Sequence, residues 1–185
     1  MKLYIKYMVS VRCKTMVQAK LDELGLHYGT VDLGEMEFRQ SISLQQHSQL
    51  QRELQHLGIE LLDQHQGKVI NQLKAVIMNL VLHADTLPKI KNSAYISQQM
   101  NRDYTQLATL FSETTGVTIE HSIITHKIER VKELLLYDEM NLTEIAHKLN
   151  YSSVAHLSAQ FKKVTGLTPT AFKQLKHKAR HLYKM

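Results

Sequence analysis

Two stretches of the chain, residues 103–114 and 153–165, combine small and hydroxyl side chains on one helical face. At the spacing i, i+3, i+4, i+7 these side chains are Thr105, Ala108, Thr109 and Ser112 in the first stretch and Ala155, Ser158, Ala159 and Lys162 in the second. Such side chains let a helix lie close to base edges, where hydroxyls hydrogen-bond and methyl groups contact thymine. Lys162 and Lys163 suit phosphate contact, whereas the first stretch offers Ser112 and Glu113. We therefore expect two groove-facing helices with unequal phosphate contacts, and we add the neighbouring Gln106, Ser152, Ser153 and His156 to the candidate DNA-binding residues.

The two stretches belong to an internal repeat. Seven positions match at an offset of about fifty residues: Ile96, Met100, Asn101, Leu107, Phe111, Gly116 and Thr118 correspond to Ile145, Leu149, Asn150, Leu157, Phe161, Gly166 and Thr168. Each copy reads as a short helix, a turn that begins at asparagine, a second helix and a closing glycine. This order predicts two helix-turn-helix units, about 92–116 and 142–166, whose second helices enter a DNA major groove. A helical hairpin duplicated only for packing is the alternative.

Helix signals fill the chain from Lys68 onward. An apolar stripe runs from Val69 to Leu80, and we expect further helices over about 94–100, 103–114, 119–137, 142–149, 153–165 and 169–183, seven in all. Asn141 and Glu144 form a capping-box pattern, and Thr168 is a candidate N-cap before Pro169.

The second copy carries the motifs of a known family. Asn150-Tyr-Ser-Ser, His156-Leu-Ser, Phe161-Lys-Lys and Thr165-Gly-Leu-Thr-Pro169 resemble the signature of AraC/XylS-type transcription regulators. The resemblance covers residues 68–185. It implies a bacterial-type regulator with two recognition helices in successive major grooves, joined by a long helix over residues 118–137. Many relatives carry an arginine where this sequence has Ala159. Sequence discrimination by the second helix-turn-helix is therefore expected to be modest, or to rest on other residues: Ser153, His156 and Ser158, together with Thr105, Gln106 and Thr109 of the first unit.

The first 65 residues follow another pattern. Strand-like residues 3–9 precede a helical stretch that stops at Gly25; two strands, 28–33 and 35–42, meet at Gly34; a helix follows Ser43, and residues 59–62 make a short strand. This β-α-β-β-α-β order is that of a ferredoxin-like domain. We therefore expect an α+β protein in which a ferredoxin-like domain, residues 1–65, precedes an all-α, seven-helix double helix-turn-helix domain, residues 68–185.

The only cysteine of the chain, Cys13, follows the first strand. The segment Met8-Val-Ser-Val-Arg-Cys13 resembles the Met-x-Cys-x-x-Cys loop of heavy-metal-associated domains, with Ser10 where the first cysteine would stand. One thiolate and a hydroxyl make a poor soft-metal site, so we expect no metal and no cofactor. Cys13 is then a residue left over from an ancestral pair, a ligand in a site shared by two protomers, or a redox-responsive thiol beside Arg12 and Lys14.

The charge of the chain is uneven. Residues 1–85 hold nine Lys/Arg and nine Asp/Glu, whereas residues 86–185 hold fourteen and eight and so carry the whole net charge of +6. A basic half favours a polyanionic partner, most simply nucleic acid, although a merely lysine-rich surface would look the same. A single cysteine suits a reducing compartment, and no apolar run approaches the ~18 residues that span a bilayer. We expect a cytoplasmic protein without membrane contact.

Sequence-specific DNA binding in transcription regulation is the leading hypothesis, with double-stranded DNA as partner and a first domain that senses a signal or dimerises. A homodimer and RNA polymerase are further partners that we consider. The alternative is a soft-metal-binding or metal-responsive protein whose helical half is an interaction module. Because the sequence has no Gly-rich phosphate loop, nucleophile elbow or HExxH motif, we expect no enzyme.

Overall fold

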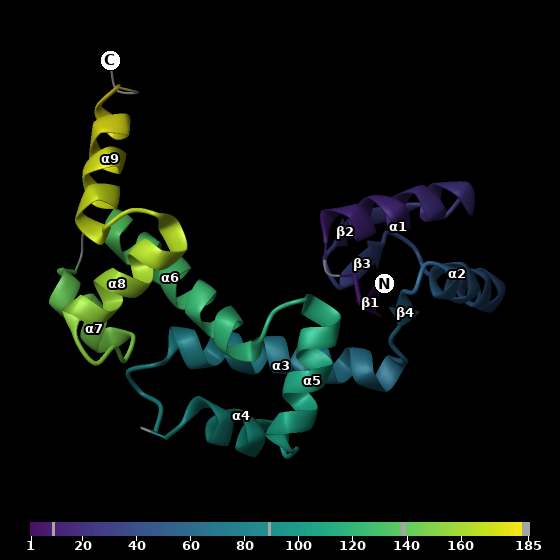
Figure 1. Ribbon diagram of the computed structural model, residues 1–185, viewed down its shortest axis with the longest axis horizontal. Coiled ribbons are helices and arrows are strands. Elements are labelled where there is room, and N and C mark those ends of the chain that lie inside the picture. Colours follow the sequence, from purple (N-terminus) through teal and green to yellow (C-terminus); the bar gives the residue numbers. More distant parts are fainter. Residues whose placement is uncertain (9, 89, 138–139, 183–185) are drawn as a thin grey trace. The chain divides into compact units, whose positions relative to one another are not determined.

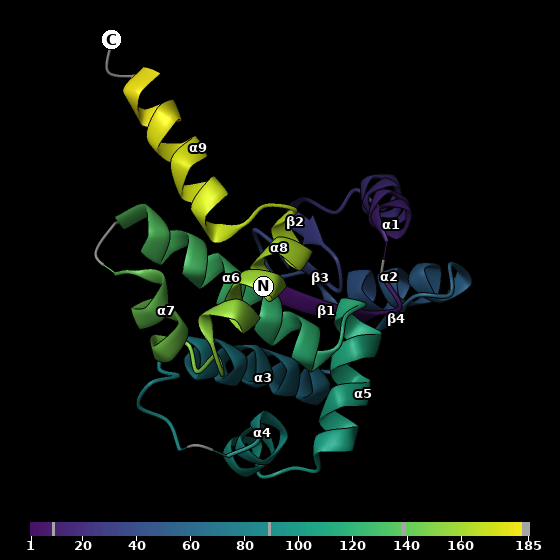
Figure 2. The ribbon, with the colours of Figure 1, turned by 60° about the vertical axis from the view of Figure 1, so that its left-hand side comes forward.

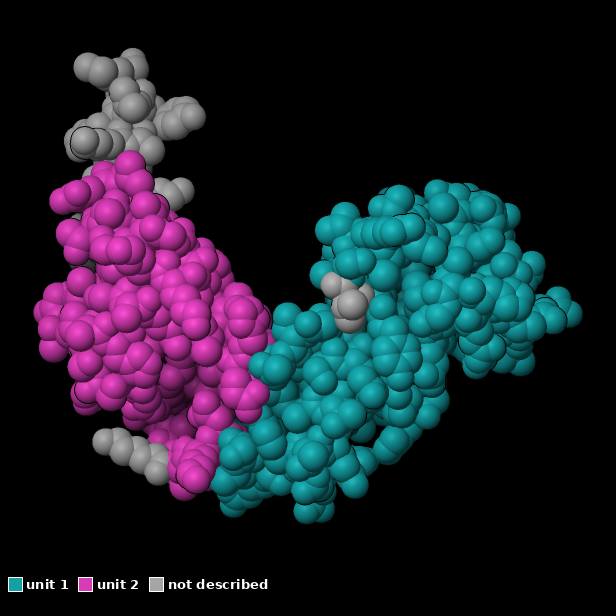
Figure 3. Space-filling model, in the orientation of Figure 1, with its two compact units in different colours: residues 1–75, 93–119 teal, residues 76–92, 120–185 magenta. Residues whose placement is uncertain are grey.

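The computed structural model describes residues 1–8, 10–88, 90–137 and 140–182, with side chains described as far as residue 175. These residues form two compact units (Figure 3). Unit 1 combines residues 1–75 with 93–119, and unit 2 combines residues 76–92 with 120–185. Within the described part of the chain, no helix is both long enough and apolar enough to cross a membrane.

Unit 1 is built on a four-stranded antiparallel sheet. The strands β1 (Lys2–Lys6), β2 (Tyr28–Asp32), β3 (Glu35–Phe38) and β4 (Glu60–Leu61) lie in the order β2-β3-β1-β4, with α1 (Val11–Glu23) after β1 and α2 (Leu44–His56) before β4 (Figure 1). The predicted alternation of strands and helices is present. The first strand is shorter than predicted, because Tyr7 has a φ of 64° and extended backbone requires a negative φ.

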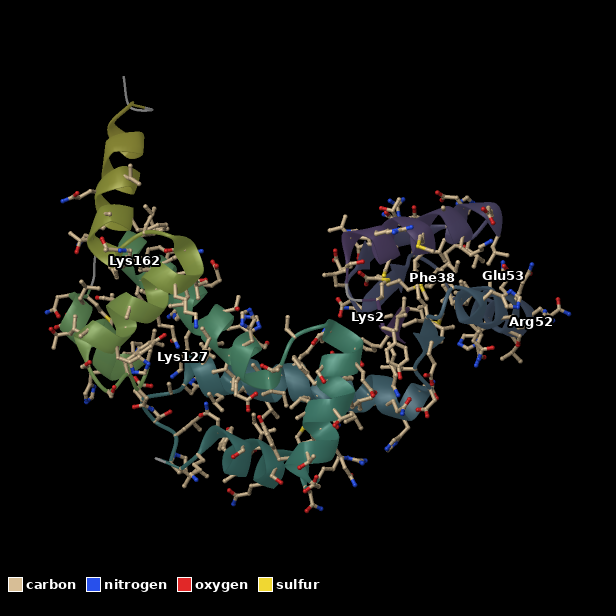
Figure 4. All side chains as sticks on the ribbon, in the orientation of Figure 1. Lys2, Phe38, Arg52, Glu53, Lys127 and Lys162 are labelled. Atoms are coloured by element: carbon tan, nitrogen blue, oxygen red, sulfur yellow. The ribbon has the colours of Figure 1, made fainter. Side chains whose placement is uncertain are left out.

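We call residues 1–62 the sheet domain. One face of its sheet carries the apolar core. Ile5, Met36 and Phe38 lie in a single cluster with Val17 and Leu21 of α1 and with Leu50 and Leu54 of α2 (Phe38 is labelled in Figure 4). Serines begin both helices: the Ser10 hydroxyl accepts the Cys13 N–H, and Ser43 forms a capping box with Gln46. The predicted helix after Ser43 is confirmed.

The opposite face of the sheet is polar and packs on α3 (Gln64–Leu82). Side chains alternate across β1, so Lys2, Tyr4 and Lys6 share this face. The Tyr4 hydroxyl donates to Asn71 Oδ1 at 3.2 Å, and Glu35 accepts hydrogen bonds from both Lys2 and Lys74. Desolvation raises the pKa of the Glu35 carboxyl, but the hydrogen bonds from Lys74 and Lys2 outweigh it and hold that pKa below its usual value. The helix begins four residues before Lys68, because the Asp63 carboxylate accepts the Gln66 N–H and caps its first turn.

The same sheet contacts α5 (Tyr104–Thr115), which follows α4 (Asn92–Met100) (Figure 2). The Tyr7 N–H donates to the Glu113 carbonyl at 2.7 Å, and Lys6 Nζ lies 3.3 Å from the Glu113 carboxylate. Gly34, at a φ of 77°, lies so close to α5 that a Cβ there would stand 1.8 Å from the Thr114 carbonyl oxygen. The sheet domain thus holds the C-terminal half of α5.

Unit 2 is helical. It contains α6 (Ile119–Tyr137) from residue 120 onward, α7 (Leu142–Lys148), α8 (Val154–Thr165) and α9 (Pro169–Leu182). Ile128, Val131 and Leu135 of α6 form a core with Ile145, Leu149, Leu157 and Phe161. The capping box of Asn141 with Glu144 and the hydrogen bond from the Ala171 N–H to the Thr168 hydroxyl confirm the two predicted helix starts.

Candidate nucleic-acid interface

The two helix-turn-helix units share their backbone geometry. Asn101 and Asn150, which begin the turns, both adopt left-handed backbone with φ of 48° and 53°. Asp103 and Ser153 then cap α5 and α8, and Gly116 and Gly166 end them at φ of 76° and 78°. This geometry confirms the predicted turns at asparagine and the predicted closing glycines. Left-handed backbone suits glycine, which has no Cβ, and asparagine adopts it more readily than most L-residues. Leu107, Phe111, Leu157 and Phe161, four matched positions of the repeat, are buried.

In the second helix-turn-helix, most of the candidate residues lie at the surface. Exposed side chains are Ser152, Ser153, Ala155, His156, Ala159, Lys162 and Lys163, and Ser158 is half-buried. Ser153 has a structural role, because its hydroxyl accepts the His156 N–H as the N-cap of α8. Lys162 and Lys163 stand in the last turn of α8 and form no ion pair among the described residues (Lys162 is labelled in Figure 4).

Two contacts hold the His156 ring of this face in a defined orientation. Its Nδ1 lies 2.9 Å from the Ser152 hydroxyl, and its ring meets the Tyr151 ring edge to face at a centroid distance of 5.3 Å. Tyr151 is itself held in place, because its hydroxyl donates to Gln160 Oε1 at 2.7 Å. Burial raises the pKa of the Tyr151 hydroxyl to about 12. These contacts fix the imidazole and leave Nε2 as its second hydrogen-bonding atom.

Side-chain contacts hold the turn that precedes α8. Lys127 Nζ of α6 donates to the Leu149 carbonyl at 2.7 Å and lies 5.1 Å from the Tyr151 ring centroid (Figure 4). Burial lowers the pKa of this lysine. The Asn150 side chain donates to the Ala84 carbonyl, and Lys148 pairs with Asp85 at 3.2 Å. The second turn is therefore held to α6 and to the segment after α3.

In the first helix-turn-helix, Thr105, Gln106 and Thr109 are exposed, and Ala108 and Ser112 are half-buried. The Ser112 hydroxyl donates to the Thr109 carbonyl within the helix. A groove of about 470 Å³ in unit 1 brings Thr105, Gln106 and Thr109 together with three basic side chains, Lys6, His65 and Arg102, and with one carboxylate, Glu113, which pairs with Lys6.

Sequence reasoning missed these basic side chains. Arg102 lies in the turn and shares a 2.9 Å contact with His65 Nε2, while Lys6 comes from β1. The position of Arg102, directly after the turn asparagine, was the signal that the sequence offered. Lys6 of β1 and His65 of α3 lie far from α5 in sequence, and only tertiary packing brings them beside that helix.

Cys13 lies in the first turn of α1, where its N–H and its sulfur both meet the Ser10 hydroxyl, the sulfur at 3.2 Å. No group of three or more His, Cys, Asp or Glu side chains that could hold a metal ion occurs in the part of the chain that the structure describes. Nothing in this arrangement favours the soft-metal alternative.

Comparison with known sequences finds relatives for the helical region. A sequence family described as a helix-turn-helix domain matches residues 96–175. An uncharacterized HTH-type transcriptional regulator of Staphylococcus aureus is 31% identical over 78 residues, which make up 42% of this chain and 10% of the relative. The uncharacterized HTH-type transcriptional regulator YtdP of Bacillus subtilis is 25% identical over 81 residues, 44% of this chain and 10% of that protein. The chain spans about a tenth of the length of the curated relatives that it matches.

Solved structures share the fold of this region. The DNA-binding domain of AdpA, solved in complex with a target DNA, superposes with a TM-score of 0.52 at 15% identity and covers 60% of this chain and 95% of that one. The C-terminal domain of AraT, a response regulator from Geobacillus stearothermophilus, gives 0.51 at 20% identity, with 58% and 84% covered. Residues 96–175 therefore match a helix-turn-helix domain, and this region shares the fold of these two solved domains, which confirms the helix-turn-helix part of the resemblance seen in the sequence.

Proposed function

We propose that the chain is a sequence-specific DNA-binding transcription regulator that places α5 and α8 in successive major grooves. The observation that carries the proposal is the match of residues 96–175 to a helix-turn-helix domain, joined to the common turn and cap geometry of its two helix-turn-helix units. The relatives from S. aureus and B. subtilis are themselves HTH-type transcriptional regulators. The 19 residues of α6 make a helix ~28 Å long, comparable with the ~34 Å of one DNA turn.

In this proposal the two recognition helices make different base and phosphate contacts. In α8, the fixed His156 ring offers Nε2 to a base edge, while Ala155 and Ala159 allow close approach to the groove floor. Lys162 and Lys163 neutralise phosphates. In α5, Thr105, Gln106 and Thr109 read bases, and Arg102 and His65 supply the phosphate contacts that the helix itself lacks.

Residues 1–65 serve as a sensing or dimerisation domain in this proposal. The strand order β2-β3-β1-β4 supports the ferredoxin-like fold expected for them. The contacts of Lys6, Tyr7 and Gly34 with α5 support a sensing role, because a change in the sheet domain would reach a recognition helix directly. A homodimer and RNA polymerase remain proposed partners beside double-stranded DNA.

The test of DNA binding is a titration of duplex DNA with the full chain at several salt concentrations. Lys162→Ala/Lys163→Ala should weaken binding several-fold at ~0.15 M salt and reduce the slope of log K against log salt by up to about two, because each phosphate contact releases counterions. Lys14→Ala/Lys20→Ala removes the same charge from α1 and is the control. Equal losses in both double variants, or no loss in either, would contradict the assignment of α8.

A further inference from the structure

A cavity of about 700 Å³ lies in unit 1, where the sheet domain meets the first turns of α3. Its apolar wall comes from β1, β4 and the start of α2, through Leu3, Tyr4, Ile42, Leu44, Leu61 and Leu62. Sites for small molecules usually have volumes of roughly 300–1,000 Å³, are lined mostly by apolar groups and lie where domains join. The cavity has the volume and the mostly apolar lining of such a site, and the proposed DNA-binding surface does not use it.

The rim of the cavity is basic. Lys2 and Lys68 line it together with one carboxylate, Asp63, whose Oδ1 already accepts the Gln66 N–H. Lys2 is paired with Glu35, but the exposed Lys68 forms no ion pair with any described residue. An anionic group at the rim would therefore find a cation without having to break an existing pair.

Leu44 adds an apolar surface at the same rim. It is the first residue of α2, is 88% exposed and is one of the residues that line the cavity. A large apolar side chain left this open loses contact with water when a ligand covers it, and burial of apolar area favours binding.

We propose that this cavity binds a small molecule that has an apolar body and one anionic group. The apolar body contacts Leu3, Ile42 and Leu44, which line the cavity, and the anionic group lies beside Lys68. The same strand links the cavity to the helix-turn-helix: Tyr4 contacts Asn71 of α3, and Lys6 and Tyr7 contact Glu113 of α5. A ligand here would thus touch the strand that holds a recognition helix. That consequence rests on the proposed function, whereas the binding itself does not.

The experiment is a calorimetric titration of the full chain, without DNA, with three matched probes: 2-naphthoate, 2-naphthylmethanol and 2-naphthylmethylamine. We expect 2-naphthoate to bind saturably at one site and more tightly than the alcohol or the amine. Lys68→Gln should weaken 2-naphthoate binding by about two- to fivefold, as expected for one solvent-exposed charge contact. Lys91→Gln is the control, because Lys91 is exposed and does not line the cavity.

A second pair of variants tests the apolar wall. Leu44→Asp removes an apolar surface and adds a like charge at the rim, at a helix start where an acidic residue is tolerated well. We expect it to weaken 2-naphthoate binding by at least fivefold, about the effect of losing one apolar contact and gaining a repulsive charge. Val11→Asp is the matched control, since Val11 is the 74% exposed first residue of α1 and lies outside the cavity.

Three results would overturn the proposal: no saturable binding of 2-naphthoate at millimolar concentration, equally tight binding of the amine, or equal effects of Leu44→Asp and Val11→Asp. Because the titration contains no DNA, none of these results bears on whether the chain binds DNA.

Discussion

Gly34→Ala should separate the sheet domain from α5. A Cβ at this position would stand 1.8 Å from the Thr114 carbonyl oxygen and 2.8 Å from the Thr114 carbonyl carbon. Both are backbone atoms of a helix, so no side-chain rotation can relieve the collision. Either α5 must move away from the turn between β2 and β3 or the turn must change shape.

Two costs add in this variant. Left-handed backbone costs an L-residue about 1–2 kcal/mol, and forcing an extra methyl into a packed contact costs about 1–3 kcal/mol. We therefore expect the free energy of unfolding of unit 1 to fall by about 2–5 kcal/mol. Gly58→Ala is the matched control, because Gly58 has a similar φ of 71° and nothing within 4 Å of the Cβ position. It should show only the first cost.

Urea denaturation of the two variants gives the stability difference. Hydrogen exchange of the Tyr7 amide reports the contact itself, because that N–H donates to the Glu113 carbonyl. Gly34→Ala should speed this exchange, and Gly58→Ala should leave it nearly unchanged. If both variants lost the same stability and both kept the Tyr7 amide protected, the close packing of α5 on the sheet would be refuted.

Two further substitutions probe charged groups. Since the pKa of Glu35 is held below its usual 4.5, the stability that this carboxylate contributes is fully present above pH 4.5 and is lost as the pH falls through the lowered value. Glu35→Gln should cost about 1–3 kcal/mol at pH 7 and flatten the acid limb of the stability curve; an unchanged limb would contradict the triad with Lys2 and Lys74. Burial lowers the pKa of Lys127 below 10.5, so unfolding takes up a proton between the two values and wild-type stability rises with pH in that window. Lys127→Met should remove this rise and cost about 1–3 kcal/mol at pH 7, because the Leu149 carbonyl loses its donor; thermal melts from pH 7 to 10.5 that match those of the wild type would contradict this.

The helical repeat was predictable from sequence because its signals are local. A capping box, an asparagine that tolerates left-handed backbone and a glycine at the helix end each act within a few residues, and the structure places all of them as expected. The helices over 104–115, 119–137 and 154–165 accordingly lie within a residue or two of their predicted limits.

The contact between the sheet and α5 was not predictable in the same way. Lys2, Tyr4 and Lys6 alternate along β1 as the side chains of a solvent-facing strand would, yet they face α3 and α5. Lys6 and Glu113 are separated by more than a hundred residues, and no local pattern links them. The groove beside Thr105 and Gln106 depends on this packing, so the single sequence offered candidate residues on α5 but did not show which basic side chains lie beside them.

Selection of bound fragments from random duplex DNA at ~0.15 M salt tests the central claim most directly, because non-specific binding is already weak there. Two recognition helices in successive grooves predict an enriched site with two short conserved blocks whose centres lie about 10 base pairs apart. Lys162→Ala/Lys163→Ala should recover less DNA in the same selection. A pool that after repeated rounds remains no different in sequence from the input would contradict the proposed function.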